Sequence, residues 1–543
     1  MTDHKMNDWW RGCVIYQVYP RSYQDTNGDG VGDLRGITQR LEYIASLGVD
    51  AIWISPFFRS PMRDFGYDVS DFCDVDPLFG TLADADALIK KADQLGLRII
   101  VDMVLNHTSD QHPWFIESSS SRDNPKADWY VWADPKPDGT PPNNWLSVFG
   151  GSSWQWHTRR KQYYLHNFLK EQPDVNFHSV SVQDALMEIM EFWLKRGVKG
   201  FRFDATNFYV HDAALRDNPI HDHVNDPQDH VPDINPYGMQ QHIYDQSRPE
   251  TLTFLARVRA LLNRYDAAMG MAELGALDAY QLIGEYSAGD KHLHMGYGFQ
   301  FLNPKFSASY VEQVVQRMEA NIQDGWPCWA FSNHDAARPV TRWNPKAGME
   351  QAFSHMLLSL LLSLRGSVCM YQGEELGLPE AEIAYEEIQD PYGLEFWPEF
   401  KGRDGCRTPM PWDHTQPHAG FSTVKPWLPV RDAHQALAVS TQESDAASSL
   451  SIARKLIKWR KQHSAMVNGA IDLQQIRPDL VRIERKNATE SLIVYVNFSA
   501  EPTSIAVSDT ELVLVSDHPL VASARLDAGT LHLQGYGVAV VRT

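Results

Sequence analysis

The chain has 543 residues, which is enough for two to four structural units with a sizeable core. Hydrophobic residues make up 43% of it and charged residues 22%, so a disordered, collagen-like or coiled-coil protein is excluded. The 49 Lys and Arg residues against 69 Asp and Glu give a formal net charge of -20. A field of that sign repels phosphate backbones and anionic lipid, so we expect neither nucleic acid nor a membrane as partner.

The cysteines and the N-terminal segment indicate the compartment. Five cysteines are present, and none forms a CxxC pair, so the sequence predicts neither a disulfide framework nor a zinc site. Residues 1–11 are polar, and no apolar run approaches the roughly 20 residues of a membrane helix. We therefore expect a cytoplasmic protein.

Short apolar segments alternate with helical patterns over the first 375 residues. Ile37, Leu41, Ile44 and Leu47, for example, recur at helical spacing between the first two segments. Eight units of a buried strand followed by a helix predict a parallel sheet closed into a (β/α)8 barrel. The expected strands are residues 13–19, 51–55, 98–104, 200–206, 268–274, 293–302, 327–333 and 367–373.

Three regions depart from this alternation. Residues 107–176 follow the third strand, exceed an ordinary connection and predict an inserted domain over the carboxyl end of the barrel. A second insertion, 207–249, follows the fourth strand, and we expect a flexible lid there. Residues 465–543 show strand alternation, which predicts an antiparallel β-sandwich. The barrel itself is expected over 1–106 and 177–464.

Polar residues stand at the carboxyl ends of several predicted strands, where barrel enzymes place their working side chains. Asp204 and Glu273 end neighbouring strands, which lie roughly 4.8 Å apart. Their carboxylates are therefore expected about 5 to 5.5 Å apart, the separation typical of retaining glycoside hydrolysis. The strand-end residues as a group are Asp102, Asn106, His107, Arg202, Asp204, Glu273, Asn333, His334 and Asp335.

Different surroundings predict different roles for the two carboxylates. Arg202 points to the same strand face as Asp204, so we expect its charge to depress the pKa of Asp204 and keep this nucleophile ionised. Glu273 lies in the less charged segment Ala272-Glu273-Leu274, which favours a raised pKa and the general-acid role. The alternative is a buried arginine–carboxylate ion pair without catalytic function.

The ordered motifs resemble the α-amylase family of retaining glycoside hydrolases, specifically its oligo-1,6-glucosidase and α-glucosidase branch. The resemblance rests on the segments DMVLNH (102–107), QPDVN (172–176), GFRFD (200–204), AE (272–273) and FSNHD (331–335). It implies that Asp204 is the nucleophile, Glu273 the acid/base and Asp335 a third carboxylate that favours the distorted transition state. The second motif usually has Leu where this chain has Val175.

The resemblance also implies a pocket closed around a terminal glucose. Asp64, in DFGYD, matches the carboxylate that pairs with Arg403 of the late segment RDGCRTP, and together they would fix the O4 end of the sugar. Further implied substrate contacts are stacking by Tyr67, hydroxyl contacts from His107 and His334, and a wall from Phe149 and Phe168.

The segment DTNGDGVGD, residues 25–33, has oxygen ligands at alternate positions and resembles the start of an EF-hand loop, without its closing Glu. In this branch it implies one structural Ca2+ or Mg2+; a solvated turn is the alternative. The implied ligands are the side chains of Asp25, Asn27, Asp29 and Asp33 and the carbonyl of Val31. We expect no organic cofactor and no zinc, although the second insertion contains His211, His221, His223, His230 and His242.

We therefore expect an exo-acting retaining α-glucosidase, monomeric or homodimeric, that releases glucose from short α-glucosides and can transfer it. Ala205 follows the nucleophile, where members of this branch that prefer α-1,6 links tend to have Val, so maltose is expected over isomaltose. The alternatives are an α-glucosyltransferase or sucrose-converting enzyme of the same fold, and a non-catalytic carbohydrate-binding protein.

Overall fold

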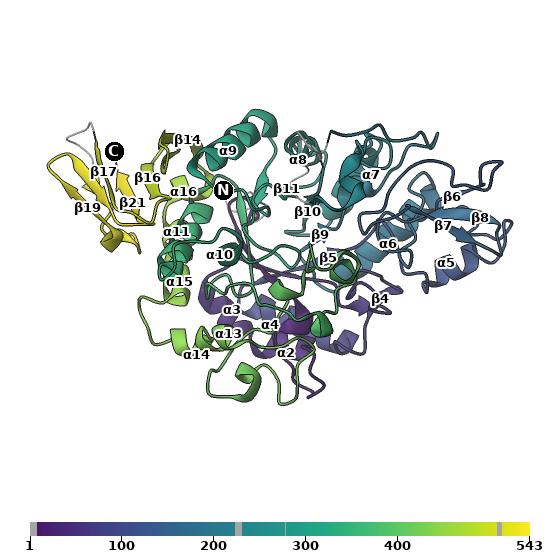
Figure 1. Cartoon of the computed structure of the whole chain (residues 1–543), viewed down its shortest axis with the longest axis horizontal. Helices are drawn as coiled ribbons and strands as arrows, with labels where there is room; N and C mark the ends of the chain where they lie inside the picture. The colour runs from purple at the N-terminus through teal and green to yellow at the C-terminus, as the bar shows by residue number, and fades with distance from the viewer. Residues whose placement is uncertain (1–7, 223–230, 277, 508–512, 543) are drawn as a thin grey trace.

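A closed barrel of eight parallel strands forms the centre of the computed structural model, which describes residues 8–222, 231–276, 278–507 and 513–542 (Figure 1). Each of the eight predicted segments contains one barrel strand, so the predicted (β/α)8 fold is confirmed. The barrel closes where Val14 of the first strand pairs with Val368 of the last. The strands are β1 (Val14–Val18), β2 (Ala51–Ile54), β5 (Arg98–Met103), β9 (Gly200–Phe203), β10 (Met269–Leu274), β11 (Met295–Gly298), β12 (Pro327–Trp329) and β13 (Ser367–Tyr371).

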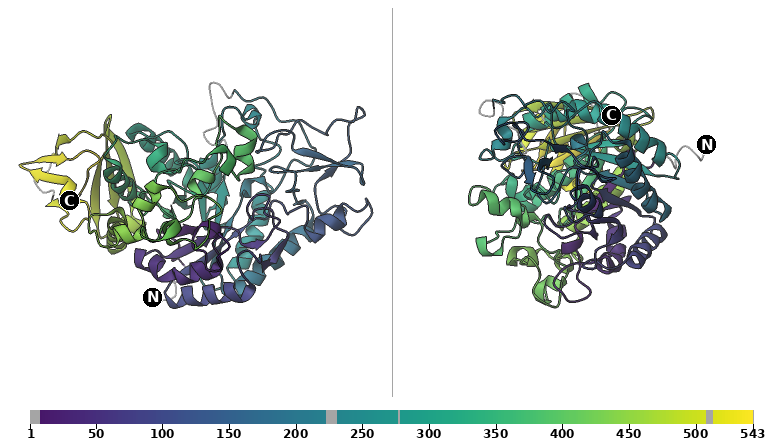
Figure 2. Two further views of the ribbon diagram at one scale, coloured as in Figure 1. Left: turned by 60° about the horizontal axis from the view of Figure 1, so that its bottom comes forward. Right: turned by 90° about the vertical axis from the view of Figure 1, so that its right-hand side faces the viewer.

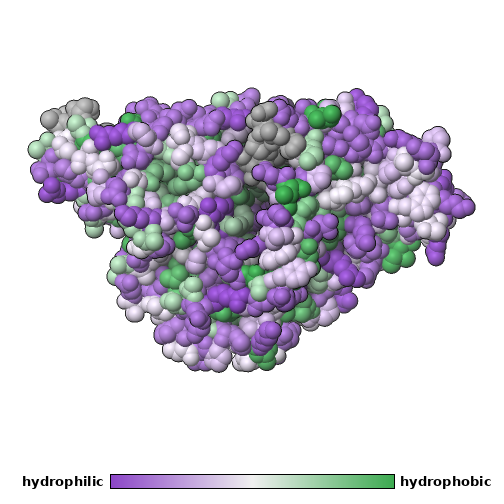
Figure 3. Space-filling view, in the orientation of Figure 1, coloured by the Kyte–Doolittle hydropathy of each residue, from purple (hydrophilic) through white to green (hydrophobic). Residues whose placement is uncertain are grey.

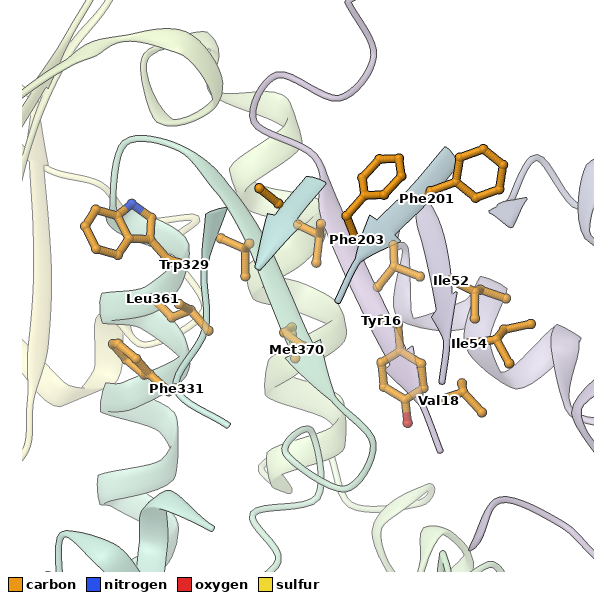
Figure 4. Close-up of a cluster of buried hydrophobic side chains, with 14 of the residues drawn as sticks. Tyr16, Val18, Ile52, Ile54, Phe201, Phe203, Trp329, Phe331, Leu361 and Met370 are labelled. Atoms are coloured by element: carbon orange, nitrogen blue, oxygen red, sulfur yellow. The ribbon is translucent and has the colours of Figure 1, made fainter. Parts of the chain in front are cut away.

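Alternation along the strands separates two cores. Side chains such as Tyr16, Ile52 and Phe201 lie between the strands and the surrounding helices (Figure 4). Their sequence neighbours, including Ile15 and Trp53, fill the barrel interior. Because successive strand residues face opposite sides, the same alternation directs Asp102, Arg202 and Glu273 inward at the carboxyl ends.

Helices cover the barrel with their apolar faces inward. Helix α4 begins with a capping box, in which Thr81 and Asp84 bind each other's backbone amides, and α3 ends at Gly48, whose φ of 83° suits glycine. The longer helices are α3 (Leu41–Leu47), α4 (Leu82–Gln94), α6 (Val180–Lys195), α7 (Thr251–Leu262), α8 (Ala279–Tyr286), α9 (Ala308–Ile322), α11 (Glu350–Ser363) and α15 (Ser449–Gln462). Shorter ones are α2 (Leu34–Gln39), α10 (Pro339–Arg342), α12 (Pro391–Phe396), α13 (Asp432–Ala436), α14 (Val439–Gln442) and α16 (Ser464–Asn468).

All eight barrel strands are shorter than the predicted segments, and β11 and β12 differ most. Segment 293–302 contains only the four residues of β11, and segment 327–333 only the three of β12. In both cases the chain leaves the sheet at the carboxyl end of the barrel, and the residues beyond it, among them Phe299 and Asp335, line a cavity there.

The first insertion has a small sheet of its own and the core residues Trp145, Trp154 and Leu165. Its elements are α5 (Pro113–Ser118), β6 (Trp132–Ala133), β7 (Trp154–His157) and β8 (Gln162–Leu165). A two-stranded ribbon of β3 (Phe58–Arg59) and β4 (Asp71–Val75) lies in the connection before α4. The domain limits at residues 107 and 176 stay a prediction.

The C-terminal region forms two antiparallel sheets, as expected. The five-stranded sheet contains β14 (Ala470–Arg477), β15 (Leu480–Lys486), β16 (Ser491–Asn497), β21 (Val538–Arg542) and β18 (Val513–Leu514), and the three-stranded sheet β17 (Thr503–Ala506), β20 (Thr530–Leu533) and β19 (Ala524–Asp527). Arg485, fully buried on β15, donates to the carbonyl of Ser363 at the end of α11 at 2.7 Å. This region and the first insertion lie at opposite ends of the molecule (Figures 1 and 2).

The surface in Figure 3 is mostly hydrophilic, with isolated hydrophobic residues. Within the described ranges, no helix combines the length and apolar character needed to cross a membrane.

Candidate active site

One buried arginine binds three carboxylates at the carboxyl end of the barrel. Arg202 Nη1 donates to Asp102 Oδ1 at 2.8 Å and to Asp204 Oδ1 at 2.6 Å, and its Nη2 donates to Glu273. Strand register brings the groups together, because Arg202 pairs with Asp102 on one side and with Met271, two residues before Glu273, on the other. A single positive charge therefore faces three acidic groups and cannot balance all three as anions. Ionisation of one group thus disfavours ionisation of the others.

Burial separates these acidic groups from bulk water and raises their pKa values. Burial raises the pKa of Glu273 to about 8, with Arg202 opposing and Asp204 and Asp335 adding to the rise. Glu273 thus carries a proton near neutral pH, as the general-acid prediction requires. Asp204 differs from the expectation: burial raises its pKa although Arg202 lowers it, so the predicted net depression is wrong. The sequence pattern shows the arginine but not the depth at which the pair is buried.

The pKa of Asp335 is shifted in the opposite direction to those of Asp204 and Glu273. Burial acts to raise its pKa, but His334, Arg403 and Arg407 outweigh burial and hold the pKa well below the usual range. Arg407 Nη2 donates to Asp335 Oδ1 at 2.7 Å, and Arg403 Nη1 donates to the same oxygen at 3.1 Å. Asp335 therefore supplies a fixed negative charge.

A chain of hydrogen bonds orients His334 and Tyr67. Burial lowers the pKa of His334 to about 3, so the ring is neutral. Gln17 Nε2 contacts Nδ1 of this ring at 2.7 Å, which places the ring proton on Nε2 toward Tyr67 and Asp335. The Tyr67 hydroxyl then donates to Asp102 Oδ2 at 3.1 Å. Tyr67 and His334 lie parallel, with ring centroids 5.4 Å apart.

The expected pair of Asp64 and Arg403 forms at the other side of the site. Arg403 Nη2 donates to Asp64 Oδ1 at 2.9 Å and to Asp390 Oδ1 at 2.8 Å, and its guanidinium lies 5.3 Å from the centre of the Phe149 ring. Burial raises the pKa of Asp64 to about 6, with Arg403 opposing the rise. Gln172, from the QPDVN motif, donates to Asp64 Oδ2 at 3.3 Å.

These groups surround a cavity of about 180 Å3. Ten of the predicted site residues line it: Asp64, Tyr67, His107, Phe149, Phe168, Asp204, Ala205, Glu273, Asp335 and Arg403. Arg202 and His334 lie behind the lining and are fully buried. The cavity is below the range of about 300 to 1,000 Å3 typical of drug-sized ligands, so it suits a short substrate.

Sequence analysis missed several residues of the site. Arg407 belongs to the same RDGCRTP segment as Arg403, so the motif contained the signal. Asp390 has no motif that predicts its contact with Arg403. The cavity lining that was not predicted consists of Val148, Asn207, Phe208, Val231, Tyr237, Gly275, Phe299 and Tyr392. Half of these lie outside any helix or strand, and the others lie in short helices whose long-range contacts follow no periodicity.

Segment 25–33 winds through repeated turns. The side-chain oxygens of Asp25, Asn27 and Asp29 each accept an amide proton from two residues further along, at 2.8 to 3.0 Å. Asp33 caps helix α2 and also accepts from Thr26. An all-oxygen set suits Ca2+ or Mg2+, yet over the described ranges no three His, Cys, Asp or Glu side chains gather as metal ligands. The metal stays a prediction.

Of the five histidines in the second insertion, three lie in the described part of the chain and two do not. His223 and His230 lie outside the described residues, as does the middle of the expected lid. His211, His221 and His242 are buried.

The barrel, the paired strand-end carboxylates and the buried arginine define the class of the protein as a barrel glycoside hydrolase. Comparison with known proteins gives the family. Residues 17–469 match the family model "Alpha amylase, catalytic domain", so the chain belongs to the α-amylase family and is a retaining glycoside hydrolase.

Related proteins match over nearly the whole chain. A probable alpha-glucosidase of Rhizobium meliloti is 54% identical over 95% of this chain and 94% of its own length. An oligo-1,6-glucosidase of Heyndrickxia coagulans is 36% identical, covering 93% and 94% respectively. Among solved structures, an alpha-glucosyl transfer enzyme has a TM-score of 0.96 at 53% identity, over 98% of this chain and 99% of that one. The trehalulose synthase of Pseudomonas mesoacidophila has a TM-score of 0.88 at 30% identity, with the same coverage.

Proposed function

We propose that the protein is an exo-acting retaining α-glucosidase that releases α-glucose from the non-reducing end of short α-glucosides. The carrying observation is the shared guanidinium of Arg202, which holds Asp204 and Glu273 side by side, and burial that raises the pKa of Glu273 to about 8 supports its role as the acid. The names of the α-glucosidase and oligo-1,6-glucosidase relatives support the same activity.

The proposed reaction has two displacements. An Asp204 oxygen attacks the anomeric carbon while the glycosidic bond breaks, and Glu273 gives its proton to the leaving oxygen. Forming the ester removes the negative charge of Asp204, one of the charges that raise the pKa of Glu273. The pKa of Glu273 therefore falls, and its carboxylate can take a proton from the incoming water or alcohol, whose oxygen attacks the anomeric carbon and releases Asp204.

The ion pair at one side of the cavity supports the proposed exo mode. Asp64 and Arg403 bind each other there, and Asp390 and Phe149 hold the guanidinium in place. Their polar atoms can bind the terminal hydroxyls of one glucose, and in this proposal the ion pair would block a longer chain. Tyr67, His107 and Phe168 line the same cavity and would contact the ring.

Transfer of glucose to an acceptor other than water is the second candidate. The structural likeness to an alpha-glucosyl transfer enzyme favours it, and the proposed chemistry differs only in the oxygen that attacks the ester. We further propose a structural Ca2+ or Mg2+ at segment 25–33, held by Asp25, Asn27, Asp29, Asp33 and the carbonyl of Val31.

A substrate panel tests the function. We expect cleavage of p-nitrophenyl α-glucoside and maltose, weaker cleavage of isomaltose and little of sucrose, with the α-anomer seen first by NMR. A β-anomer would exclude the retaining mechanism, and cleavage inside a blocked long oligosaccharide would exclude the exo mode. Products at high acceptor concentration separate hydrolysis from transfer.

A further inference from the structure

The second insertion contains a buried acid–base pair outside the catalytic groups. His242 Nδ1 lies 2.6 Å from Asp245 Oδ2, and the two side chains are 1% and 0% exposed. The other ring nitrogen, Nε2, lies 2.9 Å from the carbonyl oxygen of Tyr237. Both nitrogens of one histidine thus face oxygen acceptors.

This geometry determines how many protons the pair holds. A carbonyl oxygen can only accept, so Nε2 must carry a proton. The contact at Nδ1 then needs a second proton, either on the imidazole or on the carboxyl of Asp245. Hydrogen bonds at both ring nitrogens therefore hold His242 at two points.

The pair holds one wall of the substrate cavity. Tyr237 lines the cavity and is 2% exposed, and the His242 ring stacks on its ring with centroids 3.7 Å apart. His242 therefore fixes both the ring and the backbone carbonyl of Tyr237. On the other side of η3 (Pro236–Met239), Asn235 caps the turn by accepting from the Tyr237 amide at 3.0 Å and donates to the carbonyl of Val148 at 2.8 Å.

A hydrogen-bonded bridge connects this wall to the ends of both catalytic strands. Gln246 Nε2 donates to the Tyr237 hydroxyl at 3.1 Å, and Gln246 accepts from the side chain of Asn207. Asn207 follows the nucleophile Asp204 by three residues, and its amide also donates to the carbonyl of Gly275, two residues after Glu273, at 2.9 Å.

Tyr237 packs in one cluster with Ala205 and Phe208, which follow the nucleophile Asp204 by one and four residues. A glucose held by Asp64 and Arg403 would direct its anomeric carbon toward Asp204, so the group bonded to that carbon would extend toward this cluster.

We propose that His242 and Asp245 are positioning residues that fix Tyr237 as the wall against the leaving group and the acceptor. The inference rests on the proposed α-glucosidase function and deepens it. It identifies the side of the cavity that selects the leaving group and the acceptor, rather than the side that binds the glucose. The two hydrogen bonds of the His242 ring lock the wall, and Gln246 and Asn207 set its distance from the reacting carbon.

The test compares three variants with the wild type. His242→Gln has a single amide nitrogen in place of two separate ring nitrogens and loses the ring that stacks on Tyr237, so the wall loosens. Asp245→Asn can remake both contacts, because its amide donates to Nδ1 of a neutral ring whose proton stays on Nε2. His211→Gln is the matched control: it is a buried histidine of the same insertion whose ring packs on Trp145 and His178 and not on Tyr237.

We expect His242→Gln to lower kcat/KM for maltose at least tenfold. We also expect the ratio of hydrolysis to transfer, which measures the partition of the glucosyl-enzyme between water and acceptor, to rise at least fivefold. Inhibition by glucose, which reports the Asp64 side, should change less than twofold. Asp245→Asn and His211→Gln should stay within threefold of the wild type in all three measurements.

Three results would overturn the proposal: kcat/KM and partition unchanged in His242→Gln, glucose inhibition weakened as much as kcat/KM, or Asp245→Asn as impaired as His242→Gln. If His242→Gln does not fold, Gln246→Ala carries the test, with at least a threefold shift of the partition expected and no shift refuting the bridge. A wild type that cleaves no α-glucoside refutes the proposed function instead. Hydrogen exchange then decides the inference. The inference requires that His242→Gln speeds amide exchange, relative to the wild type, more at residues 235–246 than at residues 200–207. It fails if the two segments respond equally.

Discussion

Glu273→Gln provides a test in which catalysis and stability are expected to move in opposite directions. The amide cannot give a proton to the leaving oxygen, so kcat should fall by several orders of magnitude for maltose. In the wild type, burial raises the pKa of Glu273 from 4.5 to about 8, which means that the folded state holds a proton that the unfolded chain releases. Stability contributed by this group is therefore complete below pH 4.5 and is lost as the pH rises through 8.

The size of the stability effect follows from the same values. Between pH 5 and pH 9 the folded group stays protonated over about three pH units in which the unfolded group is ionised, so at ~1.4 kcal/mol per unit the wild type loses about 4 kcal/mol. Glu273→Gln has no carboxyl group to ionise at this position and so does not lose this stability. Its free energy of unfolding, relative to that of the wild type, should therefore rise by about 4 kcal/mol from pH 5 to pH 9. Urea unfolding at both pH values measures it.

A suitable control is Glu399→Gln, because Glu399 is exposed and, unlike Glu273, does not contact Arg202. This variant should follow the wild-type pH dependence. If Glu273→Gln shows the wild-type decline in stability between pH 5 and 9, the buried proton on Glu273 does not exist and the general-acid argument loses its physical basis.

Three further predictions address the nucleophile, the linkage and the metal. Asp204→Asn should lower kcat by several orders of magnitude while azide restores glucosyl transfer in Asp204→Gly, and an amide variant with a tenth of wild-type activity would contradict the assignment. Ala205 has φ 44° and ψ 44°, a left-handed conformation that a β-branched residue rarely adopts. Ala205→Val should therefore destabilise the fold by about 1 to 3 kcal/mol and lower the maltose-to-isomaltose ratio of kcat/KM, whereas Ala205→Gly should fold normally. An unchanged ratio in Ala205→Val refutes the linkage argument. Chelator should lower the melting temperature and Ca2+ restore it, with Asp29→Ala indifferent to both; a wild type equally indifferent would make segment 25–33 a solvated turn.

The elements that sequence predicts well are those with a local signal. Ile52 and Ile54 belong to a short apolar run between helical patterns, and all eight such runs lie in the barrel. The strand-end carboxylates follow, since closing a barrel brings the strand ends together whatever the details of packing. Asp64 and Arg403 could be paired through the family motifs, although 339 residues separate them in the chain.

Other properties depend on packing that no local pattern encodes. The direction of the Asp204 pKa shift depends on how deeply the acidic groups are buried, and neighbouring residues in the sequence do not reveal it. The contact of Tyr237 with His242 arises inside an irregular insertion, where neither helical nor strand spacing predicts which side chains meet. The division of Arg403 among Asp64, Asp335 and Asp390 is likewise a product of the assembled loops.

The pairing of β1 with β13 also affects how the chain can fold while it is being made. The two strands are neighbours in the barrel, yet most of the catalytic region separates Val14 from Val368 along the sequence. A ribosome must therefore synthesise more than two thirds of the chain before β1 meets its last neighbour. Until then the growing parallel sheet has an open, apolar edge that can pair with other chains. Nascent fragments that end before β13 should bind chaperones strongly, and release should coincide with emergence of residues 367–371 from the ribosome.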